Sequence, residues 1–202
     1  MTRPVGGHRA AFLDRDGVIN VDRGYVWRRE DFEFVPGALE GARRLHEAGN
    51  LLVVVSNQSG IGRGLYSEAD FAELSSWMKQ EFSAVGAPLA GVYYCPHHPI
   101  DAVGAYRREC SCRKPGPGML LTAASELDID LASSLMFGDK TSDLEAARIA
   151  GIPMRVLLGT DAREVPAMPT TPGLAGAAYR GLLDATADAA LLAPRSGVAA
   201  AG

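Results

Sequence analysis

Cysteine is scarce in this chain, and its placement limits what the few thiols can do. Only three cysteines occur among the 202 residues, Cys95, Cys110 and Cys112. An odd number cannot form a closed set of disulfides, and Cys110 and Cys112 are too close along an extended chain for good disulfide geometry. Two histidines, His97 and His98, lie beside the first cysteine. We therefore expect thiolates that bind a metal rather than a disulfide framework.

The sequence also lacks an excess of basic residues and any long apolar segment. Its formal net charge is −4, whereas a nucleic-acid-binding surface normally needs a basic stripe, so we expect no nucleic-acid partner. No run approaches the roughly 20 apolar residues of a membrane-spanning helix, and residues 1–9 have no apolar run behind their charges. These absences favour a cytoplasmic protein without membrane contact, and a monomer is the default expectation.

What the sequence does contain is a regular alternation of short apolar runs and helical stretches. Continuous apolar runs predict buried parallel strands, because strands covered on both faces lose the in-and-out alternation. The runs are residues 10–13, 51–55, 90–94, 134–137 and 154–158. Their order predicts an α/β fold with a Rossmann-like, doubly wound parallel sheet. The length suits one core, and we expect a single domain over residues 1–192.

Signals at helix ends place the helices between these strands. Pro36-Gly37 opens the first helix and Gly49 closes it. Ser67 with Asp70 three residues later predicts a variant capping box at the start of the next one. The expected helices are residues 37–49, 67–85, 117–127 and 143–150, with a last helix around 183–192. A surface loop is expected over residues 161–173 and a disordered tail over residues 193–202.

Two aspartates, Asp14 and Asp16, follow directly on the first apolar run. Both carboxylates should emerge at the carboxyl end of a buried strand, where open α/β sheets bind ligands. One carboxylate there can attack an electrophile while the other transfers a proton, although the pair alone is a weak signal because turns favour aspartate. Later strand and loop ends carry a hydroxyl, an ammonium group and further carboxylates, a set that suits a phosphoryl group and a divalent cation. These residues are Ser56, Lys114, Asp139 and Asp143.

A second constellation combines the three thiols with a histidine. Cys95, His97, Cys110 and Cys112 provide four ligands, the number that a closed tetrahedral zinc site requires. The spacing differs from the common two-residue knuckle, so three unrelated thiols remain the alternative. Spacing alone also leaves open whether His97 or His98 is the histidine ligand.

Asp14, Ser56, Lys114 and Asp139, in this order, resemble the four motifs of the haloacid dehalogenase superfamily of phosphotransferases. The resemblance implies that Asp14 is the nucleophile and that Asp16 is the general acid and base. An acid at the second position indicates a phosphatase, since dehalogenase relatives lack it. Ser56 and Lys114 would then hold the oxygens of the transferring phosphoryl group.

The same resemblance implies a catalytic Mg²⁺. Its ligands would be Asp14, the backbone carbonyl of Asp16 and Asp139, because Mg²⁺ prefers hard oxygen ligands. Asp143 would act at one remove from the metal, or it would only be a charge favoured by a helix N-terminus.

Within the superfamily, the chain is similar to the D-glycero-D-manno-heptose 1,7-bisphosphate 7-phosphatases over about its first three quarters. The segments that carry the similarity are residues 12–17, 20–25, 56–60, 94–99 and 110–115. It implies the absence of a large cap domain and a structural zinc loop over residues 95–112, with Cys95, His97, Cys110 and Cys112 as ligands. It also implies these substrate contacts: Asp22, Arg23, Gly24, Tyr25, Asn57, Gln58, Ser59 and Arg113. One departure is Ser56, where threonine is common, and it keeps the hydroxyl.

The activity implied by this similarity is removal of the C7 phosphate from heptose 1,7-bisphosphate, through an aspartyl-phosphate, in the biosynthesis of nucleotide-activated heptose for lipopolysaccharide or a related glycan. Arg113, next to Lys114, offers a planar bidentate donor for the phosphate that does not react, unless it only pairs with Glu109 at the surface. A histidinol-phosphate phosphatase or another small phosphate-ester phosphatase is the enzymatic alternative. A zinc-stabilised module that binds a phospho-ligand without catalysis is the alternative from another class.

Overall fold

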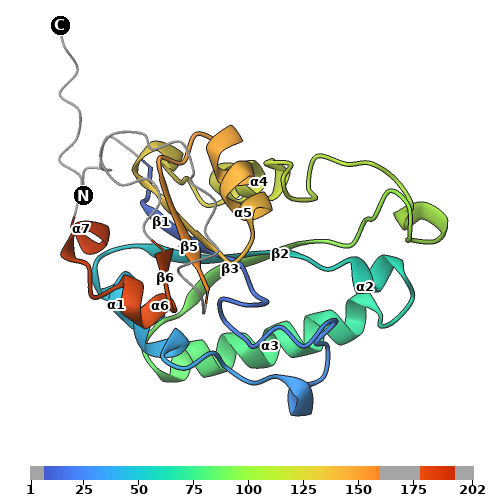
Figure 1. The fold of residues 1–202 in the computed structure, drawn as a ribbon, viewed down its shortest axis with the longest axis horizontal. Helices are drawn as coiled ribbons and strands as arrows, with labels where there is room; N and C mark the ends of the chain where they lie inside the picture. Colours follow the sequence, from blue (N-terminus) through green and yellow to red (C-terminus); the bar gives the residue numbers. More distant parts are fainter. Residues whose placement is uncertain (1–6, 160–177, 194–202) are drawn as a thin grey trace, which may run out of the picture.

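A six-stranded parallel sheet forms the centre of this computed structural model, which describes residues 7–159 and 178–193 (Figure 1). The strand order is β3-β2-β1-β4-β5-β6, and each neighbouring pair is parallel. The strands are β1 (Ala10–Leu13), β2 (Leu51–Asn57), β3 (Leu89–Cys95), β4 (Leu135–Gly138), β5 (Met154–Leu158) and β6 (Ala178–Tyr179). The first five confirm the predicted strands, and the doubly wound α/β fold is confirmed with them. The short β6 was not predicted.

The helices between the strands also follow the prediction closely. They are α1 (Ala38–Glu47), α2 (Ser59–Gly62), α3 (Glu68–Ala84), α4 (Gly118–Glu126), α5 (Thr141–Ile149), α6 (Leu182–Ala185) and α7 (Ala189–Leu192). Three short 3₁₀ turns are η1 (Arg29–Asp31), η2 (Gly104–Tyr106) and η3 (Leu131–Ser133). The capping box at the start of α3 is present, with the Ser67 hydroxyl accepting from the Asp70 backbone N–H.

One expectation about the helices was wrong, and one short helix had not been predicted. The short α2 was not predicted, and the single last helix around residues 183–192 is instead two short helices, α6 and α7. The turn between them satisfies its own backbone groups, because the amides of Ala187 and Asp188 donate to the carbonyls of Asp184 and Ala185. The loop predicted over residues 161–173 and all but the first residue of the tail predicted over residues 193–202 lie outside the described residues.

Helices cover both faces of the sheet and produce two apolar layers. Figure 1 shows α1 and α3 on one face and α4 and α5 on the other. All four residues of β1 are buried, and they alternate between the layers: Ala11 and Leu13 pack in the layer with α1 and α3, whereas Ala10 and Phe12 pack in the layer with α4 and α5. This double coverage explains why the strands read as continuous apolar runs rather than as an alternating pattern.

The position of β1 decides where the site forms. This strand lies between β2 and β4, with Leu13 in register with Val54 on one side and with Phe137 on the other. The carboxyl ends of three neighbouring strands therefore meet where the strand order reverses, which is the usual ligand-binding position in open α/β sheets.

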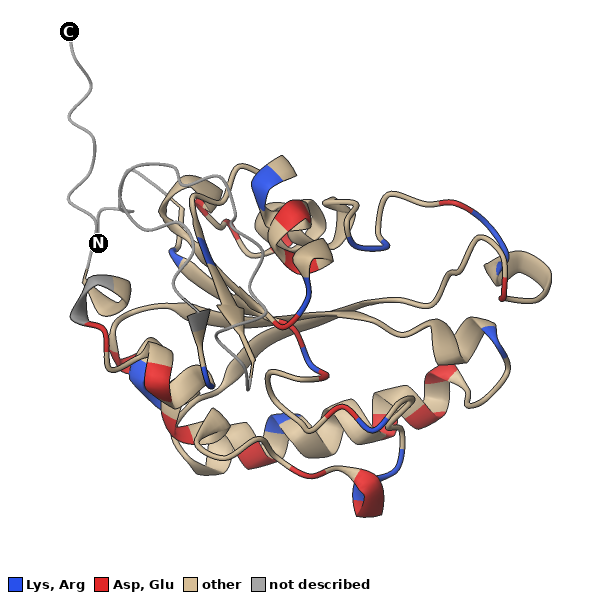
Figure 2. Cartoon of the chain, in the orientation of Figure 1, with Lys and Arg blue, Asp and Glu red and all other residues tan. Residues whose placement is uncertain are grey.

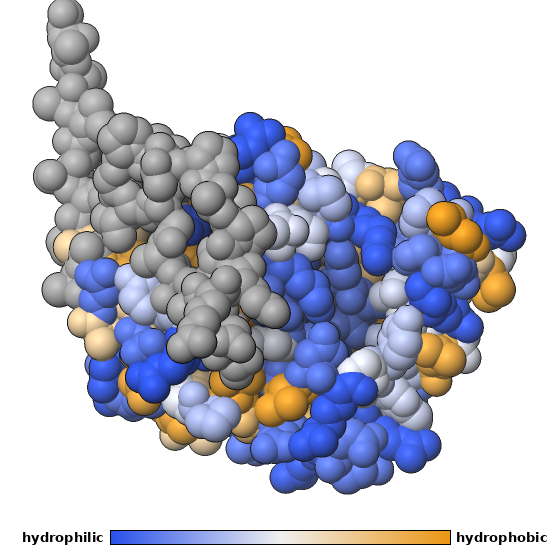
Figure 3. Space-filling model, viewed as in Figure 1, coloured by the Kyte–Doolittle hydropathy of each residue, from blue (hydrophilic) through white to orange (hydrophobic). Residues whose placement is uncertain are grey.

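Charge and hydropathy on the surface are mixed. Acidic and basic segments both occur along the helices, and they lie next to each other between β4 and α5 (Figure 2). The face seen in Figure 3 is mostly hydrophilic, with separate apolar patches at its edges. Among the exposed large apolar side chains are Ile100 and Val103, in the segment between β3 and α4. No helix of the described part is long and apolar enough to cross a membrane.

Candidate active site and metal-binding loop

Asp14 lies immediately after β1 and is 5% exposed. Its backbone N–H donates to the Phe137 carbonyl at 2.9 Å, which fixes the residue against β4. One carboxylate oxygen, Oδ1, lies 2.7 Å from Lys114 Nζ. Burial raises the pKa of Asp14 to about 7, although the Lys114 ammonium acts in the opposite direction. A carboxylate this poorly solvated is a strong candidate to receive a cation or an electrophile.

Lys114 reaches this point from the loop before α4. Besides Asp14, its Nζ lies 2.7 Å from Asp143 Oδ1 and donates to the Val55 carbonyl at 2.8 Å. Burial favours the neutral amine, but the two carboxylates outweigh it and raise the pKa of Lys114. The Asn57 side chain fixes the lysine backbone, accepting from its N–H at 3.0 Å and donating to its carbonyl at 3.1 Å. The lysine is therefore a charged and rigidly held cation beside Asp14.

Three carboxylates form a cluster that suits a hard divalent cation. Oxygen atoms of Asp14, Asp139 and Asp143 all lie within 4.8 Å of one another. Asp139 Oδ1 is buried and has no hydrogen-bond partner in the described part of the chain, and burial raises the pKa of this carboxyl. Gly17 lies against it with φ 86°, and a Cβ there would be 2.3 Å from Asp139 Oδ2. An all-oxygen donor set with an unpartnered buried oxygen fits Mg²⁺.

Asp143 has contacts expected from each of the two alternatives that the sequence left open, a charge at a helix N-terminus and a place near the metal. It lies in the first turn of α5, and its Oδ2 accepts from the Lys140 backbone N–H at 3.0 Å, as expected of a helix N-terminal carboxylate. Its other oxygen faces Lys114, and the side chain belongs to the carboxylate cluster.

The Asp16 carboxylate is held by three side chains. Arg15 Nη2 lies 2.9 Å from Oδ1 and 3.0 Å from Oδ2, Asn20 Nδ2 donates to Oδ1 at 3.0 Å, and Gln58 Nε2 donates to Oδ2 at 3.0 Å. The same Gln58 nitrogen donates to Ser56 Oγ at 2.7 Å. Because Ser56 accepts this bond, its own hydroxyl proton is free for a ligand oxygen.

Two adjoining cavities open at these strand ends. The smaller, of about 50 Å³, is lined by Asp14, Asp16, Ser56, Asn57, Lys114, Lys140, Ser142 and Asp143. The larger, of about 310 Å³, is lined by Asp16, Asp22, Gly24, Tyr25, Asn57, Gln58, Ser59, Tyr66 and Lys140. Asp16, Asn57 and Lys140 line both cavities. The smaller cavity thus contains the charged groups that suit a phosphoryl group, and the larger one is shaped for the rest of a ligand.

Most of the substrate contacts expected from the sequence line the larger cavity, but two arginines do not. The Arg23 side chain forms an ion pair with Glu33 instead of lining the cavity, and both side chains are more than half exposed. Arg113 Nη1 donates to the His97 carbonyl at 3.3 Å, beside the cysteine cluster.

Lys140 is a site residue that the sequence reasoning did not assign. Its Nζ lies 3.1 Å from Asp22 Oδ2 and 3.6 Å from Asp139 Oδ2, so it connects the larger cavity with the carboxylate cluster. The two neighbouring carboxylates raise its pKa even though burial opposes this. The signal that could have identified Lys140 as a site residue was its position directly after Asp139, close to the carboxyl end of β4.

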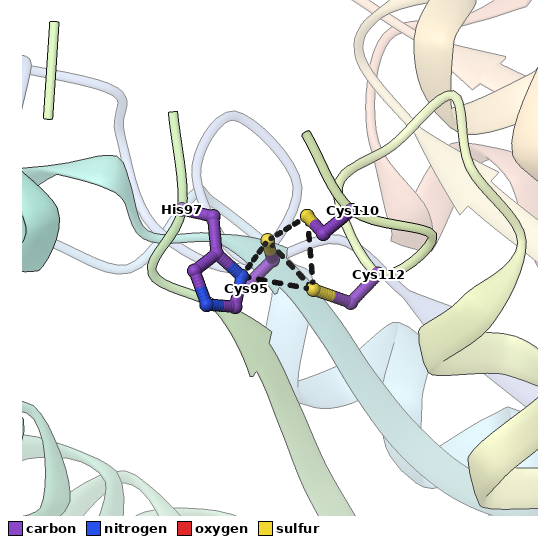
Figure 4. Close-up of side chains that lie close together, drawn as sticks. All are labelled: Cys95, His97, Cys110 and Cys112. Carbon is purple, nitrogen blue, oxygen red and sulfur yellow. Dashed lines mark hydrogen bonds between the residues drawn. The ribbon is translucent and has the colours of Figure 1, made fainter. Parts of the chain in front are cut away.

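The second cluster lies in the segment between β3 and α4 (Figure 4). Cys95 Sγ, His97 Nδ1, Cys110 Sγ and Cys112 Sγ all lie within 4.8 Å of one another. The dashed contacts in Figure 4 span 3.0 to 3.6 Å; the three sulfur–sulfur contacts, at 3.0 to 3.5 Å, are shorter than the roughly 3.8 Å edge of a tetrahedral zinc site, so the sulfurs would move apart slightly around a bound ion. The thiols are free, and burial raises the pKa of Cys95, so a bound cation would be needed to hold that thiolate. The donor set fits Zn²⁺.

The structure also distinguishes the two histidines. His97 turns its Nδ1 toward the sulfurs. His98 Nδ1 instead accepts from the backbone N–H groups of Ile100 and Asp101, at 3.3 and 3.0 Å. The histidine of the cluster is therefore His97.

The chain is similar to known proteins in sequence and in fold. A family model described as HAD-hydrolase-like matches residues 111–173. The D-glycero-beta-D-manno-heptose-1,7-bisphosphate 7-phosphatase of Vibrio cholerae is 51% identical over 151 residues, which are 75% of this chain and 81% of that protein. The D-glycero-alpha-D-manno-heptose-1,7-bisphosphate 7-phosphatase of Burkholderia mallei is 52% identical over 151 residues, 75% of this chain and 80% of that protein.

The fold is shared with a solved phosphatase. The crystal structure of D,D-heptose 1,7-bisphosphate phosphatase from B. bronchiseptica, complexed with magnesium and phosphate, superposes with a TM-score of 0.75 at 31% identity, covering 89% of this chain and 96% of that one. With half of the aligned residues identical over four fifths of the relatives' length, the chain belongs to the family of the D-glycero-D-manno-heptose 1,7-bisphosphate 7-phosphatases in the haloacid dehalogenase superfamily.

Proposed function

We propose that this chain hydrolyses the C7 phosphate of D-glycero-D-manno-heptose 1,7-bisphosphate and leaves heptose 1-phosphate, in the biosynthesis of nucleotide-activated heptose for lipopolysaccharide or a related glycan. The observation that carries the proposal is the small cavity, in which Asp14, Lys114 and Ser56 converge. It adjoins a larger cavity that can take a sugar. Family membership adds the identity of the sugar.

The first chemical step transfers the phosphoryl group to the enzyme. A carboxylate oxygen of Asp14 attacks phosphorus while the bond from phosphorus to the C7 oxygen breaks, and Asp16 gives its proton to the departing alkoxide. Asp16 is suited to this because it lines both cavities, so it borders the path from the phosphoryl site to the sugar. Lys114 and the Ser56 hydroxyl hold the equatorial phosphoryl oxygens, where charge accumulates.

The second step regenerates Asp14. Asp16, now a carboxylate, takes a proton from water as the water oxygen attacks phosphorus, and the bond from phosphorus to Asp14 breaks to release inorganic phosphate. Splitting the reaction in two is useful because phosphate monoesters resist direct attack by water. Backbone N–H groups near Asp16 and Asn57 complete the phosphoryl site.

A magnesium ion would be held by Asp14, the backbone carbonyl of Asp16 and Asp139, with Asp143 supporting through Lys114 and the start of α5. When bound, Mg²⁺ supplies positive charge that neutralises phosphate oxygens and brings them close to the nucleophile.

The substrate contacts follow from the lining of the larger cavity. Asp22, Gly24 and Tyr25 would face the sugar from one side, and Gln58 and Ser59 from another. Lys140, which lines both cavities, would contact the substrate near the reacting end. Arg113 lines neither cavity and donates to the His97 carbonyl; its assignment to the phosphate that does not react rests on the family resemblance and on its place next to Lys114. Arg23 joins the proposal as part of the 22–25 segment, although its side chain pairs with Glu33.

The zinc loop over residues 95–112 is proposed to be structural, because its four ligands leave no open coordination position. A single domain over residues 1–192, a cytoplasmic location and a monomeric state complete the proposal, with the sugar bisphosphate as the partner. Relatives named for the alpha and the beta anomer are equally similar to the chain, at 52% and 51% identity, so preference for one anomer has to be measured.

The test is release of phosphate from both anomers of heptose 1,7-bisphosphate, with and without Mg²⁺, and with histidinol phosphate as the comparison substrate. We expect Mg²⁺-dependent release of one phosphate from the bisphosphate and much slower turnover of histidinol phosphate. Faster turnover of histidinol phosphate would assign the chain to the other phosphatase group.

Asp14→Asn is the matched inactive variant. It keeps the size of the side chain and removes the nucleophilic charge, so turnover should be lost while the circular dichroism spectrum stays unchanged. A beryllium fluoride adduct should occupy Asp14 in the unmodified protein and not in the variant. Activity retained by the variant would remove Asp14 from the mechanism.

A further inference from the structure

Arg15 is the largest fully buried side chain of the described part, at 1% exposure. The proposed chemistry does not use it, yet it lies between the two catalytic aspartates in the sequence. Its guanidinium carbon lies 5.7 Å from the centre of the Phe71 ring on α3. A cation in such a place is unusual, because charged side chains are rarely buried without several partners.

One atom of Arg15 makes all its recorded polar contacts. Nη2 lies 2.9 and 3.0 Å from the two oxygens of Asp16 and 2.7 Å from the Val26 carbonyl. Nε and Nη1 are buried and have no hydrogen-bond partner among the residues described. Unpaired buried donors reduce stability, so an apolar side chain of similar size would serve the core at least as well.

On the side away from Asp16, Arg15 donates to a backbone carbonyl, that of Val26. The Val26 carbonyl belongs to a buried residue directly after Tyr25, which lines the larger cavity together with Asp22 and Gly24. Arg15 thus connects a buried backbone carbonyl with the carboxyl group that must meet the leaving oxygen. Asn20 and Gln58 each contact only one oxygen of that group, whereas Arg15 contacts both.

We propose that Arg15 is a positioning residue. By donating to both Asp16 and the Val26 carbonyl, it orients the carboxyl group of Asp16 toward the leaving oxygen. The inference rests on the proposed function. During proton transfer one oxygen of Asp16 continues to accept from Arg15, which fixes the plane in which the other oxygen delivers its proton. Proton transfer depends steeply on such alignment, because donor and acceptor must come within hydrogen-bond distance.

The experiment uses two small esters that differ in their need for an acid. p-Nitrophenolate leaves without being protonated, whereas the alkoxide of glycerol 2-phosphate needs a proton. The measured quantity is kcat/KM for each ester, which covers only the steps up to departure of the alcohol. The ratio of the values for the two esters does not depend on how much of the preparation is folded. Asp16→Asn supplies the benchmark, with the glycerol ester losing far more than the aryl ester.

Arg15→Met and Arg15→Lys are the test variants. Methionine fills the apolar part of the space, and lysine keeps a cation that has a single nitrogen and a shorter reach. In both, we expect the ratio for glycerol 2-phosphate over p-nitrophenyl phosphate to fall about tenfold or more, a part of the 10²–10⁴ that a general acid contributes. If the methionine variant does not fold, the lysine variant decides.

The control is Leu45→Ala, a buried residue of α1 that lowers stability away from the site and should leave the ratio unchanged. Equal losses on both esters in the Arg15 variants, or an unchanged ratio, would overturn the positioning role. The proposed function fails separately, through the absence of Mg²⁺-dependent phosphate release from heptose 1,7-bisphosphate, and a benchmark variant without selective loss would contradict the role of Asp16.

Discussion

Lys114 illustrates how the site depends on individual atoms. Its Nζ lies 2.7 Å from a carboxylate oxygen of Asp14 and 2.7 Å from one of Asp143, in a place that water hardly reaches. Two carboxylates this close would repel each other without a cation between them. The lysine therefore stabilises the arrangement before any substrate arrives, and it presents the same charge to a phosphoryl group afterwards.

The first residue-scale prediction concerns Arg113. Losing a charge-assisted contact to a remote phosphate should cost on the order of 1.5–3 kcal/mol, or about one to two decades in kcat/KM. Arg113→Ala should therefore impair hydrolysis of the bisphosphate strongly and that of a small monophosphate ester only slightly, as measured by phosphate release. Arg107→Ala, an exposed arginine of the same segment, is the control and should affect neither.

Arg113 lies beside the cysteine cluster, so its removal could also affect metal binding. Because its side chain contacts the His97 carbonyl, zinc content has to be measured in the same preparation. Equal losses on both substrates with zinc retained would mean that Arg113 supports the reacting phosphate or the fold.

At the residue scale, the sequence predicted the polar residues that follow strand ends, because that position has a fixed chemical meaning in parallel sheets. Asp14, Ser56, Lys114 and Asp139 come together as expected. Arg15 and Lys140 escaped assignment for different reasons. The burial of Arg15 depends on packing against α3, which no local pattern encodes, and the ion pair of Lys140 with Asp22 joins segments far apart in the chain.

At the scale of elements, the segment between β3 and α4 is tied to α2. The Val103 N–H donates to the Gly62 carbonyl at 2.8 Å, and Arg63 pairs with Asp101 at 2.7 Å. A Cβ on Gly62 would lie 2.4 Å from the Pro96 carbonyl oxygen, so the two backbones are in direct contact. Because α2 begins at Ser59, on the wall of the larger cavity, the segment between β3 and α4 supports that wall.

The element-scale prediction follows from this contact. Elemental analysis should find close to one zinc per chain, and Cys110→Ala should lower the zinc content and the melting temperature, because metal binding contributes folding free energy. Ser111→Ala, an exposed neighbour, is the control and should keep both. Hydrolysis of a small ester should decline less than stability does, since the cluster lies outside the phosphoryl cavity.

A protein without metal that keeps full stability and activity would rule out the structural zinc. Loss of small-ester hydrolysis in step with zinc, in protein that is still folded, would mean that the segment between β3 and α4 serves the chemistry directly.

The same contacts explain which elements the sequence could indicate. Long runs such as α3 and β2 have periodicity and end signals of their own. The four-residue α2 contains two glycines, which disfavour a helix. It forms because the segment between β3 and α4 packs against Gly62, and Tyr25 and Tyr66, which line the larger cavity, pack against Gly60. The formation of α2 is therefore decided by tertiary contacts.

For the whole molecule, the buried carboxylates link stability to pH and to magnesium. The pKa of Asp14 is raised from 3.8 to about 7, so the folded metal-free protein binds more protons than the unfolded chain between these values. Its free energy of unfolding should therefore fall as pH rises through this interval. Mg²⁺ binds the deprotonated carboxylates, so its stabilising effect should grow over the same range.

This predicts a pH-dependent thermal shift. The increase in melting temperature on adding Mg²⁺ should be small near about pH 5 and larger near about pH 8, as measured by differential scanning fluorimetry. In Asp14→Asn the increase should depend less on pH, because that variant cannot titrate at the position. An equal increase at all pH values in the unmodified protein would contradict the coupling.

The interior place of β1 has a consequence for amide hydrogen exchange. Its residues are paired with β2 on one side and β4 on the other, and the Asp14 N–H continues this pairing. Exchange at such an amide requires opening of the central sheet, so its protection should approach the global free energy of unfolding. The N–H of Arg107, an exposed residue between β3 and α4, donates, among the residues described, only to the nearby Gly104 carbonyl, at 3.2 Å, and should exchange much sooner. Mass spectrometry of exchanged peptides should therefore find Asp14 in the slowest-exchanging part of the sheet, which makes the candidate active site one of the last regions to open.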